Sequence, residues 1–199
     1  PIYGFQLTHP RNLILRSMTI VGFNDGIRVG GICSNNRLDR LTLRRNTSRG
    51  IYLFGPAVDK FTIVSNVIIS NGSAALEGGI RIQDGDRNLV QNCRINGNGQ
   101  HGVLLDGSAS SNKITGAVFM SNATGAVRIS NPVALRNTVS FSTCVGRNAT
   151  DLGVTVIDGR FNSVSNCTIR RFGVAGVSLE GSAVTNRVAF NVIYSNGRN

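Results

Sequence analysis

Six side chains suited to proton transfer or to anion binding recur at matching positions of a repeated sequence. They are Asp25, Arg28, Arg49, Tyr52, Arg81 and His101. Removing a proton from a carbon that bears a carboxylate requires a cation to neutralise the carboxylate, a base to take the proton and an acid. Arginine, histidine and tyrosine have these functions. The set therefore predicts a site for proton abstraction from a uronic acid.

Each predicted role follows from the chemistry of the side chain. We expect Arg28 and Arg81 to neutralise carboxylates. We expect His101 to be the base, Tyr52 the acid and Asp25 an orienting group.

We predict that Arg49, from this set, and Arg128, which occupies the same repeat position as Arg28 and Arg81, bind substrate. The alternative is that the outward positions of a solvated sheet are simply polar, and that a basic protein fills them with arginine. The sequence leaves both interpretations open.

A repeat of 23 to 26 residues must position these side chains. Its reference position is apolar each time, at Leu15, Leu38, Val64, Val90, Ile114, Val139, Val164 and Val188. Apolar residues follow three and five positions later, and a second apolar pair comes about twelve positions on, after a small residue. Such a fixed period is the signature of a solenoid. The short stretches, rich in Val and Ile, are typical of strands with alternate side chains inside.

Equivalent strands of successive repeats run in the same direction, so we expect them to pair in parallel. An asparagine recurs two residues before most reference positions, as Asn36, Asn88, Asn112, Asn137, Asn162 and Asn186, and predicts a column of stacked turn amides. A glycine recurs before the third strand, as Gly26, Gly50, Gly79, Gly102, Gly153 and Gly176. It predicts either a positive φ or a close backbone approach.

This combination of a turn asparagine, spaced apolar residues and a glycine resembles the right-handed parallel β-helix of the pectate-lyase-like superfamily, over 13–196. The resemblance implies a single all-β domain over 1–199, a solenoid of about eight rungs of 23–26 residues with three short strands in each rung. That superfamily includes polysaccharide lyases, hydrolases and epimerases, phage tailspikes and adhesins. The resemblance therefore implies the fold and leaves the function open.

The first repeat also resembles the mannuronan epimerases. Tyr3-Gly4-Phe5 with His9, followed by Asp25-Gly26, is similar to that family's Tyr-Gly-Phe-Asp-Pro-His segment and its later Asp-Gly. The resemblance implies catalytic roles for Tyr3, His9 and Asp25, with His9 as a second candidate base and Tyr3 as a second candidate acid. This chain lacks the Asp-Pro, and its Tyr-to-His spacing is one residue longer. Alternatively, Tyr3 and His9 belong to an incomplete preceding rung.

The net charge of +11 favours an acidic partner, which we expect to be a polysaccharide outside the cell or at its surface. Nucleic acid is disfavoured, because the chain has no Trp, three Tyr and no basic run with interleaved aromatic residues. No apolar run approaches the length of a membrane span. Because Pro1 is not a natural initiator, we expect that a leader or an upstream region has been removed. Both ends lack an obvious cap, so we expect a fragment of a longer chain, an end covered by another chain, or end-to-end or homo-oligomeric association.

No cofactor is predicted. The cysteines show no CxxC spacing and are expected to be small core residues, with Cys33 in a turn. Four acidic residues, Asp84, Asp106, Asp158 and Glu180, each precede a glycine. A stacked column of carboxylates would suit calcium, but Asp-Gly is also the common dipeptide of a tight turn, and we favour the turn.

The sequence therefore predicts a β-helix that recognises an extracellular acidic polysaccharide and, as an enzyme, would epimerise it or cleave it by β-elimination. The competing hypothesis is a non-catalytic structural or adhesive module of a tailspike, surface protein or fibre. Longer turns beside a groove would favour the enzyme. The extra residues at 48–56 and 70–79 are the candidates for such turns.

Overall fold

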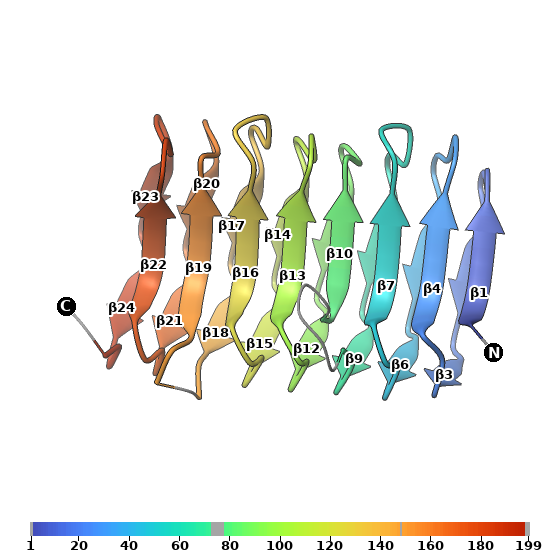
Figure 1. The fold of residues 1–199 in the computed structure, drawn as a ribbon, viewed down its shortest axis with the longest axis horizontal. Helices are drawn as coiled ribbons and strands as arrows, with labels where there is room; N and C mark the ends of the chain where they lie inside the picture. Colours follow the sequence, from blue (N-terminus) through green and yellow to red (C-terminus); the bar gives the residue numbers. More distant parts are fainter. Residues whose placement is uncertain (1, 73–77, 148, 198–199) are drawn as a thin grey trace.

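The chain forms a solenoid of three parallel sheets. The computed structural model describes residues 2–72, 78–147 and 149–197, and these contain 24 strands and no helix. In these ranges no helix is therefore present that could cross a membrane. Figure 1 shows the rungs side by side, from the N-terminal rung in blue to the C-terminal rung in red. The predicted all-β solenoid of about eight rungs, with three strands in each, is confirmed.

Each sheet takes one strand from every rung, and the strands follow chain order. The first sheet contains β1 (Tyr3–Thr8), β4 (Asp25–Gly30), β7 (Arg49–Phe54), β10 (Ile80–Gln83), β13 (His101–Asp106), β16 (Gly125–Ser130), β19 (Leu152–Ile157) and β22 (Ala175–Glu180). The second contains β2 (Ile14–Arg16), β5 (Arg37–Asp39), β8 (Thr62–Val64), β11 (Leu89–Gln91), β14 (Lys113–Thr115), β17 (Thr138–Ser140), β20 (Ser163–Ser165) and β23 (Arg187–Ala189). The third contains β3 (Thr19–Val21), β6 (Thr42–Arg44), β9 (Val67–Ile69), β12 (Arg94–Asn96), β15 (Val118–Met120), β18 (Thr143–Val145), β21 (Thr168–Arg170) and β24 (Val192–Tyr194).

The core is a stack of aliphatic columns, because parallel strands in register place like side chains above one another. The reference column was predicted one residue late in the third rung. Ile63, not Val64, pairs with Leu38 on one side and Val90 on the other. The consecutive apolar residues at 63–64 remove the alternation that marks the inward face elsewhere.

The predicted asparagine column is present. Asn112 Oδ1 accepts a hydrogen bond from Asn88 N at 2.9 Å, and Asn137 Oδ1 accepts one from Asn112 N at 2.9 Å. A second column, which was not predicted, runs through Asn46, Asn71, Asn98 and Asn122 at another turn. These buried amides satisfy turn N–H groups that water cannot reach.

The recurring glycines permit close approach between rungs. A Cβ added at Gly26 would lie 2.7 Å from Gly50 O, and one at Gly102 would lie 2.5 Å from Phe119 Cδ1. None of the six glycines has a positive φ, so of the two predicted reasons the close approach is the correct one. The four cysteines are free and buried, as expected of small core residues.

Candidate anion-binding and catalytic site

The outer face of the first sheet carries a row of polar side chains that crosses the rungs. Register pairs Arg28 on β4 with Tyr52 on β7, and Tyr52 with Arg81 on β10. The row continues through Leu104 to Arg128 on β16. Successive members are about 4.8 Å apart, the spacing of neighbouring strands.

Tyr52 is the centre of a group of guanidinium ions. The guanidinium carbons of Arg28, Arg81 and Arg49 lie 5.5, 5.4 and 4.2 Å from the centroid of its ring. The Phe54 ring stacks on Tyr52 with centroids 5.2 Å apart. Each guanidinium is attracted to the negative face of an aromatic ring, so the rings help hold three like charges on neighbouring strands.

Asp25 lies at the N-terminal side of the guanidinium group around Tyr52 and binds two of its arginines. Its carboxylate is fully buried and lies 3.0 Å from Arg49 Nη1 and 3.9 Å from Arg28 Nη1. Arg28 Nη1 also donates a hydrogen bond to Tyr3 Oη at 2.8 Å. Tyr3 pairs directly with Asp25 in the β1–β4 register. The structure thus brings these four predicted residues together.

Arg81 is held by Asp106 from the next rung. Its Nη2 lies 2.6 Å from Asp106 Oδ2, and its Nε lies 3.2 Å from the same oxygen. Burial by itself would lower the pKa of Arg81, but the hydrogen bond to Asp106 and nearby negative charge raise that pKa above its usual value. Arg81 therefore stays cationic.

Asp106, Phe54 and Gln83 were not predicted as site residues. Each of them lies two residues after a member of the polar row, on three adjacent strands, and the three are in register with one another. They therefore point outward as well. Tyr52 Oη donates a hydrogen bond to Gln83 Oε1. The signal that could have found them is this two-residue offset, because alternate residues of one strand share a face.

His101 begins β13, two rungs from Arg49 in the same outward column. Its Nδ1 lies 3.0 Å from Thr124 Oγ1. Burial and then the charge of Arg128 lower the pKa of His101 to about 4. The ring is therefore neutral at pH 7, the form in which a histidine can accept a proton. Gly78, which carries no side chain, occupies this column between Arg49 and His101.

His9 lies apart from the other candidates. It follows β1 in a turn with a φ of 55°, and its Nδ1 accepts a hydrogen bond from Ile32 N at 2.8 Å. Tyr3 is at the opposite end of the same strand, and six extended residues span about 20 Å. The structure therefore does not bring His9 to Tyr3 and Asp25, and His9 caps a turn instead.

The two predicted insertions have different outcomes. Most of 48–56 is strand β7 itself, which has the same length as β4, so that prediction of a flanking turn is wrong. Of the other insertion, at 70–79, residues 73–77 lie outside the described residues.

The acidic residues that precede glycines serve turns and ion pairs. Asp84 Oδ1 accepts a hydrogen bond from Ser108 N at 2.8 Å, and Asp158 Oδ1 accepts one from Ser182 N at 2.7 Å. Both aspartates have positive φ. Asp106 binds Arg81. In the described part of the chain no three His, Cys, Asp or Glu side chains form a group that could hold a metal ion.

Comparison with known proteins places the chain in a family. The family model described as a right-handed β-helix region matches residues 3–145 and 77–199. The chain belongs to this family. No curated protein matches its sequence.

Solved structures that are similar to this chain include two proteins named for alginate and one bacteriophage tailspike. A periplasmic alginate epimerase, AlgG, superposes with a TM-score of 0.81 at 16% identity, over 96% of this chain and 47% of the epimerase. An alginate lyase from Paenibacillus has a TM-score of 0.59 at 15% identity, over 99% of this chain and 76% of the lyase. A tailspike protein of Escherichia coli O157:H7 bacteriophage CAB120 has a TM-score of 0.64 at 13% identity, over 99% of this chain and 30% of the tailspike. At these identities the likeness shows the fold alone.

Proposed function

We propose that this β-helix binds an acidic polysaccharide along the outer face of its first sheet, outside the cytoplasm. The observation that carries the proposal is the group of three guanidinium ions around Tyr52. A guanidinium offers paired N–H donors that match the two oxygens of a uronate carboxylate. The rings of Tyr52 and Phe54 offer a flat apolar surface for the C–H face of a sugar.

The polysaccharide would lie along the solenoid axis and cross the rungs. Arg28, Tyr52 and Arg81 come from three adjacent strands, so a chain laid in this direction meets them in turn. Asp25 and Asp106 balance two of the arginines, and the remaining positive charge on this face attracts the polyanion. The epimerase and the lyase with the same fold are named for alginate, an acidic polysaccharide, which supports this substrate class.

The chemistry that the site supports best is abstraction of the C5 proton of a uronate. Neutral His101 would take the proton, while Arg81 stabilises the negative charge that moves onto the carboxylate. In epimerisation a proton then returns to C5 from the opposite face. In β-elimination the C4–O bond breaks, a C4–C5 double bond forms, and Tyr52 gives its phenolic proton to the leaving oxygen.

A second candidate function is a non-catalytic binding module, as in part of a tailspike. The observation in its favour is that Arg49 and Arg81 are already paired with Asp25 and Asp106, so these side chains also hold neighbouring rungs together. Such a module would bind the polysaccharide without turnover.

The test compares the wild type with Arg81→Ala and His101→Ala on alginate, pectate and glycosaminoglycans. Binding is measured by calorimetry, elimination by the absorbance of the unsaturated product, and epimerisation by exchange of the C5 proton in deuterium oxide. Ser178→Ala, on the same face of β22, is the matched control. We expect Arg81→Ala to weaken binding and His101→Ala to abolish turnover while binding is retained.

Two other outcomes decide between the alternatives. Binding without turnover in the wild type would favour the non-catalytic module. Absence of binding to all acidic polymers would overturn the proposal. Each assay is run with calcium and with a chelator, and we expect equal results because the turn carboxylates are engaged by backbone N–H groups.

A further inference from the structure

A basic groove lies on the second sheet, around the corner of the solenoid from the candidate site. It has a volume of about 620 Å³ and is lined by Asn12, Ile14, Asn35, Asn36, Arg37, Lys60, Phe61, Thr62, Arg87 and Leu89. Three of these residues are cationic, and no carboxylate is among the ten. The groove shares no residue with the candidate site on the first sheet.

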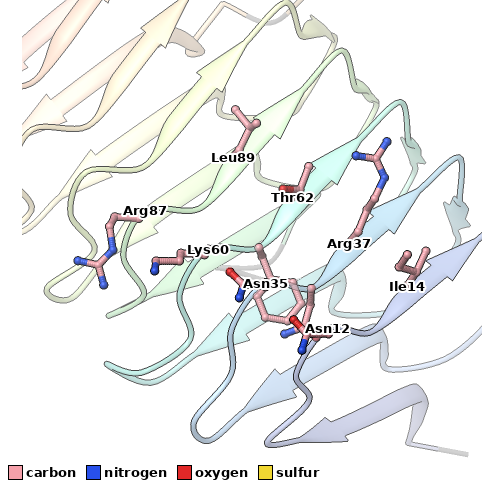
Figure 2. A pocket seen from close by; sticks show the side chains of 10 residues that line it. Asn12, Ile14, Asn35, Arg37, Lys60, Thr62, Arg87 and Leu89 are labelled. Atoms are coloured by element: carbon pink, nitrogen blue, oxygen red, sulfur yellow. The ribbon is translucent and has the colours of Figure 1, made fainter.

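The lining side chains form two rows that run along the solenoid. Figure 2 shows Asn12, Asn35, Lys60 and Arg87 in one row at the turns, and Ile14, Arg37, Thr62 and Leu89 in the other row on the strands. The turn residues have φ between 54° and 56°, so one backbone geometry repeats in all four rungs. Four rungs span about 14 Å at the strand spacing. The groove therefore suits an extended, linear ligand.

The charge of the groove is only partly compensated. Arg37 Nε lies 3.5 Å from Asp39, but that carboxylate also meets Arg16 at 3.4 Å and Arg40 at 3.7 Å. One carboxylate is thus shared among three guanidinium groups. Such an excess of positive charge attracts a polyanion.

The other two cations are Arg87 and Lys60. Arg87 Nη2 lies 2.6 Å from Asp59, and no ion pair of Lys60 is present among the described residues. Lys60 therefore has a free ammonium group for an anionic ligand. Asn12 and Asn35 are exposed and present amide donors and acceptors beside it.

The apolar part of the groove suits a sugar better than a nucleobase. Ile14 is 56% exposed and lies in the strand row with Leu89. Phe61 is the aromatic lining residue and is fully buried, so it offers no ring on which a base could stack. Aliphatic side chains pack against sugar C–H groups, while the cations bind carboxylates.

We propose that the basic groove is a second, non-catalytic site for an acidic polysaccharide, which holds a uronate segment apart from the one bound at the first sheet. The proposal rests on the proposed function for its ligand class. Because the two sites lie on different sheets, one long chain or two short chains can occupy them. Occupation of both would keep a long polymer attached while the first site releases its segment.

The experiment is calorimetry with short uronate oligosaccharides, which cannot span both sheets. We expect two oligosaccharides per protein in the wild type. The double variant Arg37→Ala with Lys60→Ala should weaken the binding of the oligosaccharide at the groove by about tenfold or more, so that only the other binding event is still seen. Turnover of short oligosaccharides should not change. The matched control is Arg136→Ala with Arg187→Ala, which removes two cations from the same two rows on other rungs.

Further variants test the groove and the first-sheet site separately. Arg37→Gln with Lys60→Gln retains the side-chain stems and should give the same loss if an alanine variant does not fold. Arg81→Ala should weaken only the other event, so failure of the first-sheet site and failure of the groove are distinguishable. One oligosaccharide per wild-type protein, unchanged in the groove variants, would overturn the inference. Tighter binding of a single-stranded oligonucleotide than of the uronate at the groove would also overturn it.

Discussion

The guanidinium of Arg49 lies 3.0 Å from the carboxylate of Asp25, which is fully buried beneath the outer face of the first sheet. The two residues pair across β4 and β7. A buried carboxylate needs a cationic partner, because removal of either charge leaves the other desolvated and unpaired.

Asp25→Asn should therefore destabilise the fold by about 3 kcal/mol, since it leaves Arg49 without its counter-charge. Chemical denaturation at neutral pH measures the change in the free energy of unfolding. Asp84→Asn is the control, because that side chain is only half-buried and an amide oxygen can still accept the hydrogen bond from Ser108 N. A loss for Asp25→Asn no larger than for the control would contradict the prediction.

Tyr52→Phe separates binding from chemistry at the first sheet. The phenylalanine keeps the ring against which the three guanidinium groups lie, so polysaccharide affinity should stay within about threefold of the wild type. It removes the hydroxyl proposed as the acid, so turnover by β-elimination should fall about a hundredfold. Calorimetry and product absorbance give the two values. An unchanged rate would remove Tyr52 from the acid role.

The pKa of His101, lowered to about 4 by burial and by Arg128, makes stability depend on pH. The unfolded chain binds a proton at this histidine near its ordinary pKa of about 6.5, whereas the native protein does not until about pH 4. The contribution of His101 to the free energy of unfolding is therefore fully present above pH 6.5 and falls as the pH drops towards 4. Below about pH 4 this contribution no longer changes. The loss should reach about 3 kcal/mol.

His101→Gln should lack this component of the pH dependence. Urea denaturation of both proteins at several pH values between 4 and 7 measures it, and the chemical shifts of the histidine ring report the pKa directly. A titration near 6.5 in the native protein would contradict the prediction.

The first asparagine column predicts a large cost for one internal substitution. Asn112 Oδ1 accepts a hydrogen bond from Asn88 N, and its Nδ2 donates to Gly85 O at 2.9 Å. Asn112→Ala leaves these buried groups unsatisfied and should cost about 3 kcal/mol of unfolding free energy. Asn186→Ala, in the half-buried last turn of the column, should cost less. Thermal unfolding compares the two variants, and equal losses would show that burial of the column does not matter.

The register of the third rung shows where sequence periodicity stops being informative. Ile63 and Val64 are both apolar, and so are 67–69, so alternation cannot tell inward from outward there. The chain places Phe61 where other rungs have the turn asparagine, and Asn88 accepts the hydrogen bond from Phe61 N. Only contact with the neighbouring rungs selects Ile63 as the inward residue.

The position of His9 could not be predicted from sequence spacing alone. Two residues that are six positions apart can belong to one site, or they can lie at opposite ends of one strand. The extended conformation of β1 decides for the latter, because a strand of six residues keeps its ends apart.

The sequence by itself determined the repeat, the three strands in each rung, the core columns of most rungs and the outward row that contains Arg28, Tyr52 and Arg81. These follow from local periodicity, which each rung carries within about 25 residues. The tertiary structure decided which charged side chains are in contact. Arg81 forms an ion pair with Asp106 of the next rung, and Arg37 and Lys60, from different rungs, line the same groove. The physical reason is that turn lengths set how successive rungs stack, and a one-residue shift moves every side chain to the other face.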